Sequence, residues 1–147
     1  MITIKILKKP TNAALESLNH LMSQMSLGPV PPKKISSKEF KELLAQKELN
    51  FLVAEAGKKA IGILNLYFIR LPSGLMAVIE DLVIDEPYRR WGVGPLLVKK
   101  AIEMAKARKA RHISLRTNPK RVEANKLYLA MGFHRMETNF YRINLFK

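Results

Sequence analysis

The chain is 147 residues long, 48% of them hydrophobic and 26% charged, which excludes a disordered or fibrous protein and predicts a single domain over residues 1–147. The 26 Lys and Arg residues against 12 Asp and Glu give a net charge of +14, which attracts nucleic acid, anionic lipid and phosphorylated cofactors alike. The absence of cysteine excludes disulfides, thiolate metal sites and a cysteine nucleophile. No run reaches the ~18 apolar residues of a membrane span, so we expect a cytoplasmic protein without membrane contact.

The first third of the chain predicts one strand and two helices. Isoleucine alternates with polar residues over residues 2–6, which is the period of a half-buried strand. Apolar residues then recur every three or four positions over residues 12–27, which predicts an amphipathic helix. Gly28 and Pro29 would stop this helix, and the proline-rich stretch that follows would form a loop. Ser36 and the glutamate three residues later form a capping-box pattern, which predicts a second, short helix.

The remaining sequence changes from strand patterns to alternating strand and helix patterns. The predicted elements are, in order, strands over 51–55, 60–70 and 75–84, a helix over 94–109, a strand over 112–117, a helix over 121–131 and one or two closing strands over 133–146. Hairpins followed by alternating strands and helices predict an α/β (α+β) domain. We expect a mixed, mainly antiparallel central sheet of about six to seven strands, flanked by about four helices.

The clearest functional pattern lies where the third hairpin strand ends and the next helix begins. Gly92 and Gly94 stand two residues apart, and Pro95 follows in the first turn of the helix. Glycine lets the backbone approach a ligand closely, and the free amides of a helix N-terminus attract anions. Arg89 and Arg90 add positive charge. The pattern indicates a phosphate or pyrophosphate site, although two glycines by themselves are equally compatible with a simple tight turn.

Two motifs, taken together, resemble those of the GNAT superfamily of acyl-CoA-dependent N-acyltransferases. Arg89, Gly92 and Gly94 fit the family signature of arginine or glutamine, two residues, glycine, one residue, and glycine or alanine. The stretch 124–133 resembles the family's fourth-helix pattern, in which alanine, asparagine, leucine and tyrosine are followed by glycine and phenylalanine. The predicted element order also matches, so the resemblance covers the whole chain. It departs from the family at the two residues after Arg89, where members commonly carry glycine and a small or basic residue.

The resemblance implies that acetyl-CoA is the co-substrate and lies between the fourth and fifth strands. Its pyrophosphate would contact backbone amides of the glycine loop, and its pantetheine arm would contact the backbone of the fourth strand. The implied cofactor-binding residues are Leu82, Val83, Ile84, Arg89, Arg90, Trp91, Gly92, Val93, Gly94 and Asn125. Trp91 can cover the cofactor or anchor a surface, and the candidates for the 3′-phosphate are Lys120, Arg121 and Lys126.

Amide formation requires an uncharged amine and a CoA thiolate that is protonated or stabilised as it leaves, so a base and an acid are expected. Tyr128 occupies the family's helix-four tyrosine position, which implies the acid. Glu80 and Asp81 are the candidates for the base. Strand alternation predicts that their side chains face opposite sides of the sheet, so only one would face the cleft, and Glu80 is favoured. Either carboxylate can instead bind the amine or form an ordinary ion pair.

Two rival functions remain open. A CoA-binding regulatory module would keep the glycine loop without catalysis, whereas the charge alone would suit a nucleic-acid-binding protein. No nucleic-acid-binding motif is evident, and the three histidines lack metal-ligand spacing, so we expect neither nucleic acid nor a metal. The expected partner is an amine acceptor, small molecule or protein, and the positive charge favours a neutral or acidic acceptor. The segment 137–143 can form an acceptor wall or a homodimer edge.

Overall fold

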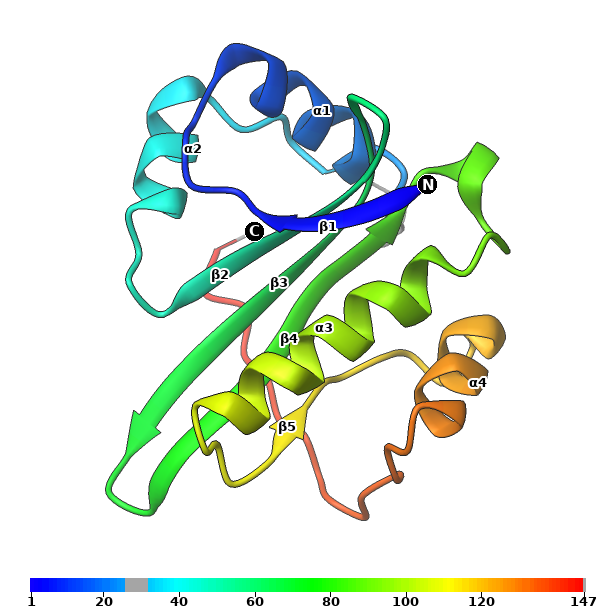
Figure 1. Cartoon of the computed structure of the whole chain (residues 1–147). Helices are drawn as coiled ribbons and strands as arrows, with labels where there is room; N and C mark the ends of the chain where they lie inside the picture. The colour runs from blue at the N-terminus through cyan, green and yellow to red at the C-terminus, as the bar shows by residue number, and fades with distance from the viewer. Residues whose placement is uncertain (26–31, 147) are drawn as a thin grey trace.

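The computed structural model describes residues 1–25 and 32–146 as three layers, a sheet with helices on both faces (Figure 1). The elements are β1 (Ile2–Ile6), α1 (Asn12–Met22), α2 (Ser37–Leu44), β2 (Leu49–Ala56), β3 (Lys59–Leu71), β4 (Gly74–Ile84), the 3₁₀ turn η1 (Glu86–Tyr88), α3 (Val93–Ala107), β5 (Ile113–Ser114) and α4 (Val122–Ala130). These residues form a five-stranded sheet in the order β1-β2-β3-β4-β5, antiparallel from β1 to β4 and parallel between β4 and β5. The expected α/β (α+β) class is confirmed. No helix among the described residues is both long and apolar enough to cross a membrane.

The two faces of the sheet bury separate apolar clusters, because successive side chains of a strand point to opposite sides. One cluster joins the sheet to α3 and α4 and includes Leu52, Leu64, Leu66, Phe68, Leu97, Val98, Ala101 and Tyr128. The other joins the opposite face to α1 and α2 and includes Leu18, Leu21, Phe40, Phe51, Val53, Ile63 and Val83. Figure 1 shows α3 lying across the face that carries the first cluster. The sheet thus separates an α3 side from an α1 side.

The first two helices show which sequence signals were reliable. The Ser36 hydroxyl accepts from the Glu39 amide over 3.1 Å, so α2 begins where the capping pattern predicted. The first helix was predicted through residue 27 but ends at Met22, because the chain leaves the helix at Ser23, whose hydroxyl donates to the His20 carbonyl over 2.6 Å. Gly28 and Pro29, the predicted stop, lie outside the described residues.

The prediction of closing strands over 133–146 is wrong, and the described sheet has five strands rather than six or seven. Only two residues of β5 form a ladder, so the outer edge of the sheet offers little backbone for another strand. The terminal segment instead carries exposed apolar side chains, among them Tyr141, Ile143 and Leu145. In Figure 1 this segment, coloured red, passes behind the sheet. Its alternating pattern is that of a strand, but it forms no ladder with the described strands.

Candidate functional site

A β-bulge in β4 forms the first part of the candidate site. The pairing of β4 with β3 shifts there, so that two residues of β4, Asp81 and Leu82, lie opposite one residue of β3. Asp81 adopts a φ of 49°, in the left-handed region that aspartate enters more readily than most residues. A bulge of this kind leaves one residue outside the ladder and redirects its side chain.

The bulge brings two carboxylates to one face of the sheet. Asn65 of β3 pairs directly with Glu80, and directly opposite residues in antiparallel strands project from the same face. The Asn65 amide nitrogen donates to Asp81 Oδ2 over 3.2 Å, which places the Asp81 carboxylate beside the same side chain. The prediction that Glu80 and Asp81 face opposite sides is therefore wrong, because the bulge interrupts the strand alternation on which it depended.

The two carboxylates have different surroundings. Partial desolvation raises the pKa of the Asp81 carboxyl above its ordinary value, although the residue as a whole is exposed, and the hydrogen bond from Asn65 offsets part of that rise. Glu80 Oε1 lies 3.5 Å from the guanidinium of Arg116, whose central carbon is 4.3 Å from the centroid of the Phe140 ring. Glu80 is thus engaged by a cation, whereas Asp81 is held by a neutral amide.

The edge of β4 that faces β5 is open beside these carboxylates. The ladder between β4 and β5 ends at the pair Val78–Ser114, whereas β4 continues to Ile84. The side chains of Leu82 and Ile84 pack with the α3 cluster, and that of Val83 packs with the α1 cluster. These three residues therefore present backbone groups at an edge that β5 leaves uncovered.

The loop from η1 to α3 leads into a helix N-terminus through two left-handed residues. Arg90 and Gly92 both adopt positive φ, 69° and 79°, and α3 begins directly afterwards at Val93 with Pro95 in its first turn. The first amides of a helix have no intrahelical partner, and left-handed residues in a loop can turn neighbouring amides toward a bound anion. These features suit an anion, and the role of the loop in binding one stays a prediction.

The two motif glycines serve different purposes. A Cβ at Gly92 would meet nothing within 4 Å, so its positive φ is the reason for glycine there. A Cβ at Gly94 would come within 3.2 Å of the Leu127 side chain, so this glycine permits the close approach of α3 and α4. The signature thus combines one residue that shapes the loop with one that positions the helix carrying Tyr128.

The arginine and tryptophan of the motif also have distinct environments. Arg89 Nε donates to the Ile84 carbonyl over 3.1 Å, which ties the loop back to the end of β4. Trp91 is 62% exposed and lies edge-on against Tyr88, with ring centroids 5.1 Å apart. An exposed tryptophan packed against a partly buried tyrosine at the entrance of the loop can cover a ligand that lies on it.

A polar network that the sequence did not reveal clamps this loop to α1. Asp85, 1% exposed, accepts from Gln24 Nε2 over 2.7 Å, and His20 Nε2 lies 3.1 Å from the same carboxylate oxygen. The other end of Gln24 accepts from the Glu86 amide over 2.9 Å. Burial alone would raise the pKa of Asp85, but Gln24, His20 and the ammonium of Lys59 hold it below its ordinary value. His20 and Gln24 lie 61 or more residues before Asp85 and Glu86 in sequence, so no local pattern could have identified these contacts.

The two predicted residues of α4 lie on the α3 side of the sheet. Tyr128 is 8% exposed and stacks edge-on against Phe133, with ring centroids 5.9 Å apart. Burial raises the pKa of its hydroxyl, and the charge of Arg121 opposes that rise. Asn125 donates to the carbonyls of Asn118 and Arg121 over 3.0 and 2.8 Å, so its amide group holds the turn that precedes α4.

The structure therefore gathers Glu80, Asp81, Asn65 and Arg116 on one face and places Tyr128 on the other. Sequence reasoning missed Asn65, although a polar residue inside the apolar run of β3 was a readable signal. No cluster of three His, Cys, Asp or Glu suited to a metal occurs within residues 1–25 and 32–146.

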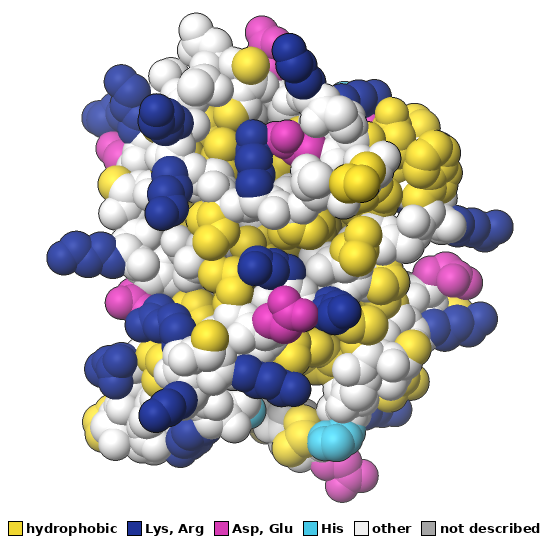
Figure 2. Space-filling view, viewed as in Figure 1, with side chains coloured by type: hydrophobic (Ala, Val, Ile, Leu, Met, Phe, Trp, Pro, Cys, Tyr) yellow, Lys and Arg dark blue, Asp and Glu magenta, His cyan; other side chains and the backbone are white. Residues whose placement is uncertain are grey.

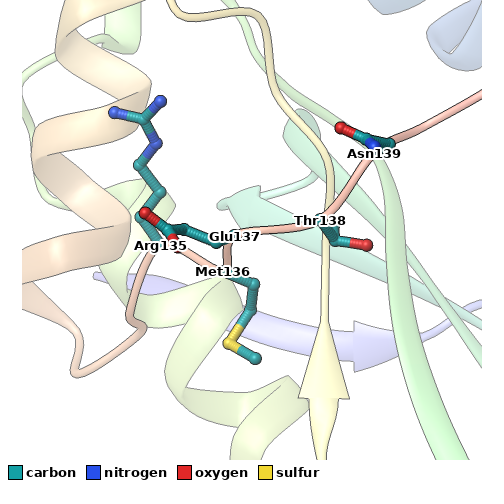
Figure 3. Close-up of a pocket in the computed structure, with 5 residues that line it drawn as sticks. All are labelled: Arg135, Met136, Glu137, Thr138 and Asn139. Carbon is teal, nitrogen blue, oxygen red and sulfur yellow. The ribbon is translucent and has the colours of Figure 1, made fainter.

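Two surface features lie outside this arrangement. A cavity of about 630 Å³ is lined by one continuous stretch, Arg135 to Asn139, and Figure 3 shows the Arg135 and Met136 side chains pointing in different directions from it. Lys and Arg side chains are scattered over the face drawn in Figure 2, among apolar and uncharged atoms. The cavity lining does not include Glu80 or Asp81. The Lys and Arg side chains form no continuous basic stripe on the face that Figure 2 shows.

Comparisons with known proteins identify a family, a curated relative and several solved structures of the same fold. Residues 15–133 match the acetyltransferase (GNAT) family model. An uncharacterized N-acetyltransferase of Methanocaldococcus jannaschii is 30% identical over 108 residues, which are 71% of this chain and 48% of that protein, so the match spans about half of the curated relative. A transcriptional regulator from Bacillus halodurans C-125 has the same fold, with a TM-score of 0.82, 27% identity, and coverage of 99% of this chain and 100% of that one. AAC(6′)-Iy in complex with the bisubstrate analogue CoA-S-monomethyl-acetylneamine has a TM-score of 0.78, 21% identity, and coverage of 98% and 99%.

Proposed function

This chain belongs to the GNAT family of acetyltransferases, and on that premise we propose that it transfers the acetyl group of acetyl-CoA to a primary amine. The observation that carries the proposal is the open edge of β4, which lies between two carboxylates on one face and a buried tyrosine on the other. The structure of AAC(6′)-Iy with a CoA-containing analogue supports the choice of donor.

The backbone around the open edge suits the donor. The amides at the start of α3 and the left-handed loop residues would hold the pyrophosphate, because they combine free N–H groups with the positive end of a helix. The absence of a Cβ at Gly92, with nothing within 4 Å of that position, leaves the approach to these amides clear. The backbone of Leu82–Ile84 would hold the extended pantetheine arm.

The side chains supply the two proton transfers. The amine nitrogen forms a bond to the acetyl carbon, and a carboxylate removes the proton that this nitrogen then carries. Asp81 has the raised pKa and is bonded to a neutral amide, whereas Glu80 is paired with Arg116, so we assign the base to Asp81 and keep Glu80 as the alternative. As the carbon–sulfur bond breaks, Tyr128 gives its proton to the departing thiolate. Its raised pKa keeps it protonated at neutral pH.

The acceptor is proposed only by class. A net charge of +14 repels polycations and slows their encounter with the protein, so neutral or acidic primary amines should be the better acceptors.

Calorimetric titration with acetyl-CoA, followed by CoA release across a panel of primary amines, tests this function. Gly92→Asp should abolish acetyl-CoA binding, because aspartate tolerates the left-handed backbone but brings a negative charge to the anion site. Gly57→Asp is the matched control, since Gly57 also has positive φ, 63°, and a Cβ there would meet nothing within 4 Å, but it lies in the β2–β3 turn. Binding without turnover of any amine would favour a regulatory CoA-binding module, and no binding by folded wild-type protein would refute the proposal.

A further inference from the structure

We propose that Asn65 holds the acceptor nitrogen, its side-chain oxygen accepting a hydrogen bond from the amine while the adjacent carboxylate removes a proton. This inference rests on the proposed acetyl transfer and adds to it a positioning residue and a preference for primary over secondary amines.

The side-chain oxygen of Asn65 accepts no hydrogen bond from the described part of the chain. It is 5% exposed on β3, and its Nδ2 donates to Asp81 Oδ2 over 3.2 Å. An ionised carboxylate only accepts hydrogen bonds, so this contact identifies Nδ2 as the atom next to Asp81 and leaves Oδ1 as the other end of the amide. Oδ1 is itself buried, and no donor from residues 1–25 and 32–146 bonds to it, so a substrate N–H reaches it only when the side chains that cover it move.

Buried polar atoms in folded proteins almost always have a hydrogen-bond partner, so an orphaned oxygen needs an explanation. Two other buried oxygens share this condition, on Asp85 and Thr117. The Asp85 oxygen has the Lys59 ammonium 3.6 Å away, and Thr117 follows β5 beyond the end of its ladder with β4. Of the three residues, Asn65 is the one that bonds to Asp81 and lies directly opposite Glu80, where the acceptor must deliver its nitrogen. The geometry therefore points to a donor that arrives with the substrate.

A neutral primary amine satisfies both groups at once. It has two N–H bonds and one lone pair, so one N–H can bond to Asn65 Oδ1 while the lone pair attacks the acetyl carbon. After the carbon–nitrogen bond forms, the second N–H faces the carboxylate and its proton passes to Asp81, while the carbon–sulfur bond breaks and the thiolate leaves. A secondary amine has a single N–H, which cannot both remain on Asn65 and pass to the carboxylate. Asn65 thus predicts selectivity for primary amines.

Asn65 also sets the pH at which the carboxylate becomes a base. The hydrogen bond from Nδ2 lowers the pKa of Asp81 against the effect of burial, and the neighbouring charged groups on the same face are Glu80 and Arg116. Removing the Nδ2 donor should raise the pKa of Asp81, so the acidic limb of kcat/KM for the amine should move to higher pH. A residue that only supported the fold would not move this limb.

The test compares Asn65→Leu and Asn65→Asp with the control Asn50→Leu, a half-buried asparagine on the adjacent strand β2. Asn65→Leu should raise KM for the best primary amine about tenfold or more, with acetyl-CoA affinity unchanged, because the lost interaction is made only with the acceptor. The ratio of activity on that amine to activity on its N-methyl derivative should fall toward unity, and the acidic limb should shift to higher pH. Asn65→Asp keeps an oxygen acceptor, so it should shift the acidic limb but retain the preference for the primary amine.

Wild-type-like KM, N-methyl selectivity and pH profile in folded Asn65→Leu would overturn the inference while leaving acetyl transfer intact. Failure of the proposed function is seen separately, as wild-type protein that binds acetyl-CoA without releasing CoA. A readout independent of turnover is the NMR signal of the Asn65 side-chain amide in the CoA complex, titrated with the same primary amine. We expect a saturable shift that the N-methyl derivative reproduces only at higher concentration, and an unchanged signal would refute the assignment whatever the activity.

Discussion

The charged form of Asp81 is less favourable in the folded protein than in water, because desolvation raises its pKa. Its pKa is raised in the folded protein, so the folded state binds the proton more tightly than the unfolded state, and the stability of the protein falls as pH rises through that raised value. Asp81→Asn removes this penalty, keeps a residue that tolerates φ of 49°, and can still accept from Asn65. We expect a higher Tm than wild type at pH 7 and a smaller difference at pH 3, together with loss of activity.

Differential scanning calorimetry at the two pH values, with CoA release measured in parallel, checks this prediction. Glu80→Gln is the companion variant, and if it abolishes turnover while Asp81→Asn does not, the base is Glu80 instead.

Tyr128 provides a second prediction at this scale. Tyr128→Phe keeps the ring that packs edge-on against Phe133 and removes only the hydroxyl, so acetyl-CoA affinity should be unchanged while kcat falls about 10²-fold, the usual effect of losing a general acid. Because burial raises the pKa of Tyr128, wild-type kcat should begin to fall only at pH values above the ordinary pKa of tyrosine. Steady-state kinetics over pH 7 to 11 measure both, and equal kcat in the two proteins would remove the hydroxyl from the mechanism.

Individual residues were predictable only where the signal is local. The glycine loop was identified from the sequence because its residues are adjacent, and the structure adds why each glycine is needed. The relative orientation of Glu80 and Asp81 was not, because a bulge depends on the register with β3 rather than on β4 alone. The roles of these residues in catalysis and cofactor binding stay predictions.

At the scale of elements, the contact between the end of α1 and the loop before α3 should matter for acetyl-CoA affinity. Gln24→Ala removes one hydrogen bond to buried Asp85 and one from the Glu86 amide, so the protein should lose about 1–3 kcal/mol of stability and several-fold in acetyl-CoA affinity. Gln46→Ala is the control, because Gln46 bonds a carbonyl at the exposed end of α2. Urea unfolding and calorimetric titration measure the two effects, and equal acetyl-CoA affinity in both variants would limit this contact to folding.

Most elements followed from the sequence because their signals are periodic or local. The hairpin strands, α2 with its serine cap, and α3 were identified from alternation, capping and helical spacing. The closing strands predicted over 133–146 do not form. An apolar pattern indicates which residues could make a strand, but it does not show whether a sheet edge is available to pair with it. The early end of α1 depended on a serine side chain that competes for a helix carbonyl.

At the scale of the whole molecule, charge should govern encounter with the donor. With a net charge of +14, attraction to the anionic phosphates of acetyl-CoA should weaken as salt screens it, so its Kd should rise between 0.05 and about 0.5 M NaCl. KM for a neutral amine should change little over the same range. Titrations at several salt concentrations check this, and a salt-independent Kd would show that the contact is made by uncharged backbone groups alone.

The bulge in β4 also means that the number of residues in this strand decides which face of the sheet each later side chain points to. In a regular strand, Ile79 and Val83 would share a face because they are four residues apart, yet they belong to opposite clusters. The extra residue shifts the phase of everything after it. Deleting one residue at Asp81 would keep nearly the same composition but exchange the side chains that face α3 with those that face α1, up to the loop before α3. Conservative substitutions should therefore be tolerated here far better than a change of one residue in length.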